Sequence, residues 1–162
     1  MRKPLRYAAY VLLTCLSLIL LSLILIPVGL LLVFGAWQLI KTERFYAERP
    51  ILHAMRSVGV SSNDSEPARS VLLQRVPLGT DSESAVAALS KESFDCKSSR
   101  WPSDENSRKL RGLEHMEMNG ALLNCQLLAP GGLGYTRWLI DLRFDEGKRL
   151  LDVRVAIWNI FL

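Results

Sequence analysis

The stretch TRWLIDLRFDEGKRLLDVRVAI, residues 136–157, decides the fold of this chain. It holds parts of two runs, 136–145 and 149–161, in which apolar and polar side chains alternate, the pattern of half-buried β-strands. Residues 146–148 (Glu-Gly-Lys) supply a turn between the runs. The stretch therefore predicts an antiparallel hairpin with one face buried and the other in water.

Two more β segments precede this hairpin. Residues 113–118 and 121–128 are rich in apolar side chains and flank Asn119-Gly120, the dipeptide typical of a two-residue hairpin turn. A Pro-Gly-Gly turn at 130–132 then leads into the hairpin. We therefore expect an antiparallel meander in the C-terminal third of the chain.

One helix is predicted upstream of the meander. Thr80 or Asp81 can cap a helix over 82–90, in which Val86 and Leu89 form an apolar edge. This helix is the obvious cover for the buried face of the sheet. The predicted fold class is α+β: a transmembrane helix, then a two-layer domain with an antiparallel β meander covered by one or two helices.

Two short strands and a loop complete the prediction for the domain. Residues 71–76 and 94–98 have the character of strands, and we expect the first of them to open the domain. Residues 99–110 are polar and predict a mobile loop, in which Trp101 is the one large apolar side chain.

An apolar segment near the N-terminus predicts a membrane anchor. Residues 8–40 contain no charged side chain, whereas about 20 such residues suffice for a helix to cross a bilayer. We expect residues 8–40 to lie in the lipid bilayer as one span kinked at Pro27. A hairpin that turns at Pro27 and a cleaved signal peptide are the alternatives.

The flanks of this segment carry the positive charge of the chain. Residues 1–49 hold six Lys and Arg against two Glu, whereas residues 50–162 hold 14 basic and 14 acidic side chains. The compact basic cluster at the N-terminus favours a cytoplasmic N-terminus slightly. Because the basic and acidic side chains of residues 50–162 balance, this part of the chain has no net positive field that would attract nucleic acid. No nucleic-acid partner is therefore expected.

We divide the chain into three parts. Residues 1–41 are a cytoplasmic tip and the transmembrane helix, 42–68 a juxtamembrane helix and a polar linker, and 69–162 an extracytoplasmic α+β domain. Residues 51–58 predict a short amphipathic helix that packs on the core or on the membrane.

Two cysteines lie outside the anchor, Cys96 and Cys125. Each shares a face with apolar neighbours on its predicted strand, so both thiols would point into the core. An even pair in an exported domain predicts a disulfide, which would stabilise the domain by about 3–4 kcal/mol. Two free buried thiols in a cytosolic domain are the alternative.

The sequence contains little that indicates catalysis. It lacks a Gly-x-Ser-x-Gly, a phosphate-binding glycine loop, a His-Glu-x-x-His and a Cys-x-x-Cys. His115 between two glutamates fits a solvated strand better than an acid–base pair, and neither it nor His53 has metal-ligand spacing to the cysteines. We expect no enzyme, no cofactor, no metal and no small-molecule substrate.

Charged side chains alternate along the final hairpin. Asp141 and Arg143 lie on one strand and Asp152 and Arg154 on the next. We expect them on the wet face, where opposite charges pair across the strands. A surface ladder of ion pairs is the favoured interpretation, and a ligand site the alternative.

The last residues suggest an interaction surface. Residues 156–162 place large apolar groups on both faces of a strand. Exposure of so many apolar groups to water would be unfavourable. Either this strand is covered on both faces, or Trp158, Ile160 and Phe161 form a docking surface for a partner or the bilayer. Trp101 is a further candidate for partner binding.

Two motifs resemble a known family. Residues 77–80, followed by Val86 and Leu89, look like the opening of the SmpA/OmlA (BamE-like) envelope domains and the related β-lactamase-inhibitor-like fold, and 138–153 look like their closing hairpin. The resemblance covers about thirty residues. It implies a binding or scaffolding module that recognises its partner by a sheet face or edge. A spanning anchor stands where that family carries a lipid.

These expectations converge on a functional class. The chain is predicted to be a single-pass protein of a bacterial inner membrane whose periplasmic domain binds another envelope protein as an assembly or scaffold accessory. An immunity-type protein that blocks a periplasm-acting toxin, a small structural subunit of a membrane complex and a hydrolase are the alternatives.

Overall fold

The computed structural model describes residues 3–59, 65–110, 113–114, 116–117, 119–131 and 134–161, and for 3–12, 14–15, 19, 110 and 161 it describes the backbone alone. Its elements are α1 (Lys3–Ala47), α2 (Pro50–Ser57), α3 (Glu66–Arg75), α4 (Ser82–Lys91), β1 (Asp95–Ser99), α5 (Glu105–Leu110), β2 (Ala121–Gly131), β3 (Gly134–Phe144) and β4 (Leu150–Phe161). The chain divides into two units, Met1–Ile40 and Lys41–Leu162.

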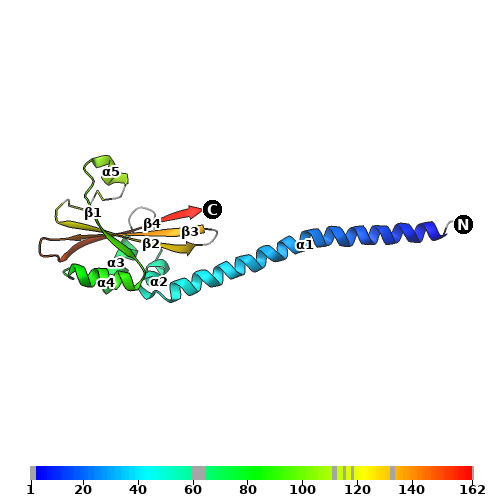
Figure 1. Ribbon diagram of the computed structural model, residues 1–162, viewed down its shortest axis with the longest axis horizontal. Coiled ribbons are helices and arrows are strands. Elements are labelled where there is room, and N and C mark those ends of the chain that lie inside the picture. The colour runs from blue at the N-terminus through cyan, green and yellow to red at the C-terminus, as the bar shows by residue number, and fades with distance from the viewer. Residues whose placement is uncertain are drawn as a thin grey trace. The chain divides into compact units, whose positions relative to one another are not determined.

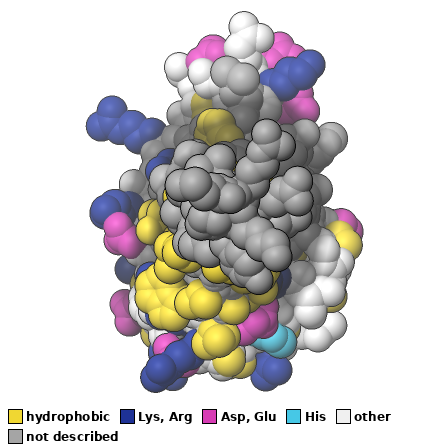
Figure 2. Space-filling view, turned by 90° about the vertical axis from the view of Figure 1, so that its right-hand side faces the viewer, with side chains coloured by type: hydrophobic (Ala, Val, Ile, Leu, Met, Phe, Trp, Pro, Cys, Tyr) yellow, Lys and Arg dark blue, Asp and Glu magenta, His cyan; other side chains and the backbone are white. Residues whose placement is uncertain are grey.

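The first unit is helical throughout its described length. Helix α1 runs through Pro27 without a break, which excludes the hairpin that would turn there. Within the described residues, Leu16–Ala47 is the one helix long and apolar enough to cross a membrane. Figure 2 shows hydrophobic side chains gathered in one area of the face it views, with Lys, Arg, Asp and Glu toward the outline.

The second unit is an α+β domain built on one sheet. Its four strands pair only with their neighbours in sequence, in the order β1-β2-β3-β4, and every pair is antiparallel. The predicted antiparallel meander is therefore confirmed for β2, β3 and β4, whereas its first strand is β1 and not residues 113–118. Figure 1 shows α2, α3 and α4 on one side of the sheet and α5 on the other.

The main core lies between the sheet and the helices on its first side. Trp138, Ile140, Leu142 and Phe144, which alternate along β3, are all at most 1% exposed. The predicted capped helix is confirmed as α4, because the Asp81 carboxylate accepts a hydrogen bond from the Ser84 amide at 2.9 Å.

Residues between the apolar segment and the predicted domain also enter this core. Tyr46 in the last turn of α1 is 2% exposed, and Leu52 and Met55 of α2 are fully buried. The amphipathic helix predicted over 51–58 is therefore confirmed as α2, and its apolar stripe packs on the domain.

The strand predicted over 71–76 is wrong, because most of it forms α3. Ser65 caps this helix by accepting a bond from the Ala68 amide, and Pro67 lies in its first turn. Ala68 and Leu72, four residues apart, are both fully buried. A short apolar run fits a strand or a buried helix equally well, so packing decided between them.

The strand predicted over 113–118 is also wrong. None of its described residues, 113–114 and 116–117, is a strand, and β2 pairs with β1 instead. Leu113 and Met116 pack with Leu122 in a second cluster. Asn119-Gly120 therefore leads into β2 from an irregular segment and is not the turn of a hairpin.

The predicted loop 99–110 contains the short helix α5. Trp101 is partly buried against the second cluster, and its indole Nε1 donates to the Gly120 carbonyl oxygen at 3.0 Å. Since Leu122 lies on the sheet face opposite the main core, the segment around α5 covers one end of that second face.

Candidate functional site

The structure pairs the two cysteines predicted to form a disulfide. Cys96 and Cys125 are directly opposite on β1 and β2, and their Sγ atoms are 2.05 Å apart. Cys125 is fully buried, and Cys96 packs partly against the main core. The bond therefore ties the edge strand β1 to the sheet.

This pair also defines which backbone groups of β1 face outward. Its Cα atoms are 3.9 Å apart, the short separation of a pair that exchanges no backbone hydrogen bonds. The amide and carbonyl of Cys96, and by alternation those of Ser98, thus point away from β2. Among the described residues, these groups make no backbone hydrogen bond outside the sheet.

The opposite edge of the sheet, β4, is covered in part. The Val155 carbonyl accepts a bond from the Ser65 amide at 2.9 Å, and Leu150 bonds to Gly79 and Thr80 through its carbonyl and its amide. The outward direction at Val155 agrees with the alternation derived from the cysteine pair. Of the two edges, β1 is the one whose outward groups have no such cover within the described residues.

A shallow polar groove of about 190 Å³ runs beside the β1 edge. The Lys97 ammonium lies 2.6 Å from the Asp95 carboxylate. The side-chain amide of Gln126 donates to the Asn124 amide oxygen at 2.6 Å. The groove therefore presents charged groups and amides beside an extended backbone.

Asp141 and Arg154 depart from the expected wet ladder. They face each other across β3 and β4, and the guanidinium donates to the carboxylate at 3.0 Å, as a cross-strand pair should. Both side chains are buried, however, with 2% and 7% exposure. Asn124 donates to the same carboxylate at 2.7 Å, which makes a buried polar row across three strands.

The other expected pair of this ladder is not formed. Arg143 and Asp152 are opposite in register, but Arg143 binds Glu117 at 3.2 Å, and Asp152 binds Arg69 of α3 at 2.7 Å. The segment before β2 and the helix α3 thus supply the nearer partners. Sequence alternation alone could not have identified them.

Trp158 and Ile160 belong to an exposed patch, which we call the aromatic patch and define by these two residues with Leu128, Tyr135 and Arg137. Trp158 is 66% exposed, Leu128 50%, Tyr135 43% and Ile160 36%. Leu128, Arg137 and Trp158 are directly opposite one another across β2, β3 and β4, and Tyr135 is opposite Ile160. The side chain of Phe161, the third predicted member, lies outside the described residues.

Trp101 does not join the aromatic patch. It packs beside Leu122, six residues along β2 from Leu128, a separation of about 20 Å at the rise of a strand. Leu128 and Tyr135 were missed because they flank a turn, with Leu128 before it and Tyr135 after it. Their alternation with the buried Leu127 and with Thr136 was the available signal.

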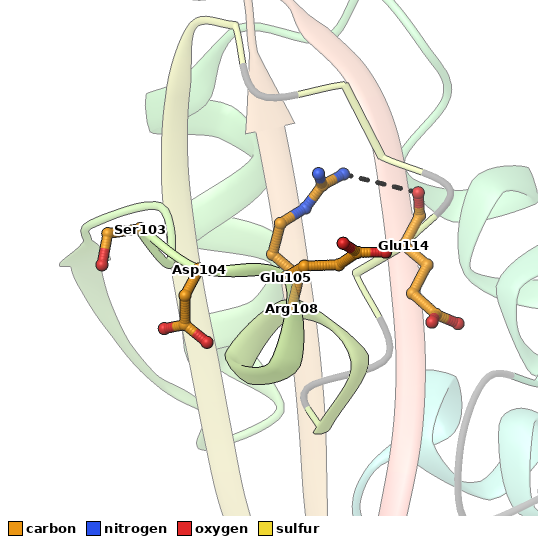
Figure 3. A pocket seen from close by; sticks show the side chains of 5 residues that line it. All are labelled: Ser103, Asp104, Glu105, Arg108 and Glu114. Carbon is orange, nitrogen blue, oxygen red and sulfur yellow. Dashed lines mark hydrogen bonds between the residues drawn. The ribbon is translucent and has the colours of Figure 1, made fainter.

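A second pocket, of about 210 Å³, lies at α5 and is lined by Ser103, Asp104, Glu105, Arg108 and Glu114. Figure 3 shows the carboxylates of Asp104 and Glu114 directed to opposite sides. Hydrogen bonds from the side chain and the amide of Ser107 hold the pKa of the Asp104 carboxyl below its usual range. Asp104 thus serves as the cap of α5, and its carboxylate does not converge with that of Glu114 as an acid–base pair would.

Of the two histidines, the structure describes only His53. His53 is exposed on α2, and His115 lies outside the described residues. Within the described part of the chain, no group of three or more His, Cys, Asp and Glu side chains is placed to hold a metal ion.

No family model, no curated protein and no solved structure matches this chain. The resemblance to the SmpA/OmlA domains therefore stays a prediction.

Proposed function

We propose that this chain is a non-enzymatic, single-pass protein of a bacterial inner membrane whose periplasmic domain binds another envelope protein through the β1 edge. The partner contributes an extended segment that adds to the sheet beside β1. The outward backbone groups of Cys96 and Ser98 are the observation that carries the proposal.

An open strand edge recognises an extended peptide by its backbone. Added strands bind through main-chain hydrogen bonds, and the side chains beside them give specificity. Here the groove with Asp95, Lys97 and Gln126 flanks the edge and suits a polar segment. A free edge is also an aggregation hazard, which a short strand and a lysine limit; β1 has five residues and carries Lys97.

The disulfide supports both the proposed binding at the β1 edge and the proposed periplasmic location of the domain. It holds β1 in register, so little order has to be gained when a partner strand adds. Disulfides persist in oxidising compartments such as the periplasm. Together with the basic N-terminal flank and the apolar length of α1, the bond favours a cytoplasmic N-terminus and an exported domain.

Site-specific photocrosslinking tests the partner. A photoreactive residue replaces Gln126 in the groove of the full chain, and the captured protein is identified from native membranes. Ser98→Pro then removes an outward amide while sparing the bonds to β2, because proline is tolerated at strand edges. We expect Ser98→Pro to lose the crosslink and Ser98→Ala, which keeps the amide, to retain it.

Unfolding temperatures of both variants are the control, since equal values show that the sheet is intact. Capture of the same protein by a folded Ser98→Pro domain would refute addition at this edge.

Thiol accessibility tests the compartment. In a Cys15→Ser chain, a thiol-reactive polymer added to cells lysed directly in denaturant should label Cys96 and Cys125 only after reduction. Labelling without reduction would place the domain in the cytosol.

A further inference from the structure

We propose that the aromatic patch docks on the surface of the membrane that α1 crosses, with the lipid headgroup region as its ligand. The inference rests on the membrane crossing proposed above, and it concerns a different surface from the β1 edge. The domain would then rest against the bilayer and leave β1 to the protein partner.

The composition of the patch is that of an interfacial surface. Tryptophan and tyrosine gather at membrane–water interfaces, where an apolar ring meets the headgroups and a polar group stays wet. Trp158 and Tyr135 supply the rings, and Leu128 and Ile160 extend the apolar area. This mixture fits the boundary between lipid and water.

Arg137 gives the patch its charge. It lies between Leu128 and Trp158 in the register, and its side chain is exposed. Among the described residues no ion pair involves it, and the patch contains no acidic residue. An arginine in an apolar surface can extend along it and contact anionic lipid headgroups.

Few residues separate the patch from the uncharged segment along the path through Tyr46 and Trp138, although the patch lies on the sheet face opposite the Trp138 side chain. The Trp138 indole donates to the Tyr46 hydroxyl, and Trp138 is the neighbour of Arg137 on β3. Six helical residues, or about 9 Å, separate Tyr46 from Ile40 at the end of the uncharged segment. Tyr135 is three residues from Trp138, or about 10 Å.

The last turns of α1 are also fixed to the domain. The Arg49 guanidinium donates to the Phe45 carbonyl at 2.8 Å, and Arg56 pairs with Glu43 at 3.0 Å. The chain path thus limits how far the patch can lie from the uncharged segment. At such a high effective concentration, a weak interfacial affinity is sufficient for docking.

Tryptophan quenching in reconstituted vesicles tests the docking. The purified full chain is placed in vesicles of phosphatidylethanolamine and phosphatidylglycerol, with or without brominated acyl chains, which quench indoles at membrane depth. Wild type, Trp37→Phe, Trp158→Phe and the double variant are compared. We expect Trp37→Phe to lose more emission in brominated vesicles than the double variant does, because Trp158 lies in the interface.

The same four proteins separate docking from crossing. A quenched Trp37 with a Trp158 that is open to aqueous iodide would overturn the docking and leave the crossing intact. An unquenched Trp37 would overturn both.

A triple variant, Leu128→Ser, Tyr135→Ser and Ile160→Ser, should expose Trp158 to iodide, whereas Leu78→Ser, at an exposed leucine outside the patch, should not. Equal iodide access in these two variants would also count against docking. Because no partner protein is present, a positive result identifies lipid as the ligand.

Discussion

Tyr46 and Trp138, 92 positions apart in the chain, share a buried hydrogen bond in which the indole Nε1 donates to the phenol oxygen at 3.2 Å. The bond joins the last turn of α1 to an inner strand of the sheet, and both side chains are at most 2% exposed. The end of α1 is thus part of the core of the domain.

Removal of the Tyr46 hydroxyl should destabilise the domain. Tyr46→Phe leaves the Trp138 N–H buried without an acceptor, which costs about 1–3 kcal/mol. Denaturant unfolding of the full chain in detergent measures the loss. Tyr135→Phe, the same change at an exposed site, is the control and should shift stability by less than about 0.5 kcal/mol. Equal effects of the two changes would contradict this account of the bond.

Breaking the buried pair Asp141–Arg154 should destabilise the domain strongly, whereas replacing both side chains by apolar ones should change its stability much less. Arg154→Met leaves the carboxylate buried without its cation and should cost about 3–5 kcal/mol, whereas the double change Asp141→Leu with Arg154→Met should recover much of the loss. Unfolding of wild type, Asp141→Leu, Arg154→Met and the double variant forms a double-mutant cycle.

The exposed pair Asp95–Lys97 is the comparison for this cycle. Its side chains are 67% and 77% exposed, so Asp95→Ala should cost less than about 1 kcal/mol. If the double change were as damaging as Arg154→Met alone, the pair would not be the origin of the cost.

Gly120 should not tolerate a side chain. Its φ is +78°, and a Cβ there would lie 1.9 Å from the Phe144 carbonyl oxygen. Gly79 has φ +83° but nothing within 4 Å of an added Cβ. Gly79→Ala therefore measures the positive φ alone, about 1–2 kcal/mol, and Gly120→Ala should lower the unfolding temperature further. A similar shift for both would show that the backbone at Gly120 moves away without cost.

The cap of α4 should make stability depend on pH. Hydrogen bonds from the Ser84 amide and hydroxyl hold the pKa of Asp81 below its usual value. Because the folded-state pKa is lowered, the stabilisation is complete above the unfolded pKa, about 3.9, and is lost as pH falls through the folded value. Wild type should therefore exceed Asp81→Ala in unfolding temperature at pH 7, and the gap should narrow below pH 4. A gap independent of pH would show that the charge contributes nothing.

Local patterns in the sequence were sufficient for much of this fold. Alternation defined the final hairpin, the capping residue defined α4, and the apolar length defined α1, because each of these signals acts within a few neighbouring residues. The cysteine pair was also predictable from the placement of each thiol on the apolar side of its strand.

Only the tertiary structure decided which segments cover each surface of the sheet. Asp141 and Arg154 alternate like wet residues but are buried, the short apolar run at 71–73 fits a strand but belongs to a helix on the core, and Trp101 packs far from Trp158. Alternation reports which side of a strand a residue occupies. Burial of a side chain depends also on segments distant in the chain. Contacts with such segments produce no periodic pattern in the sequence.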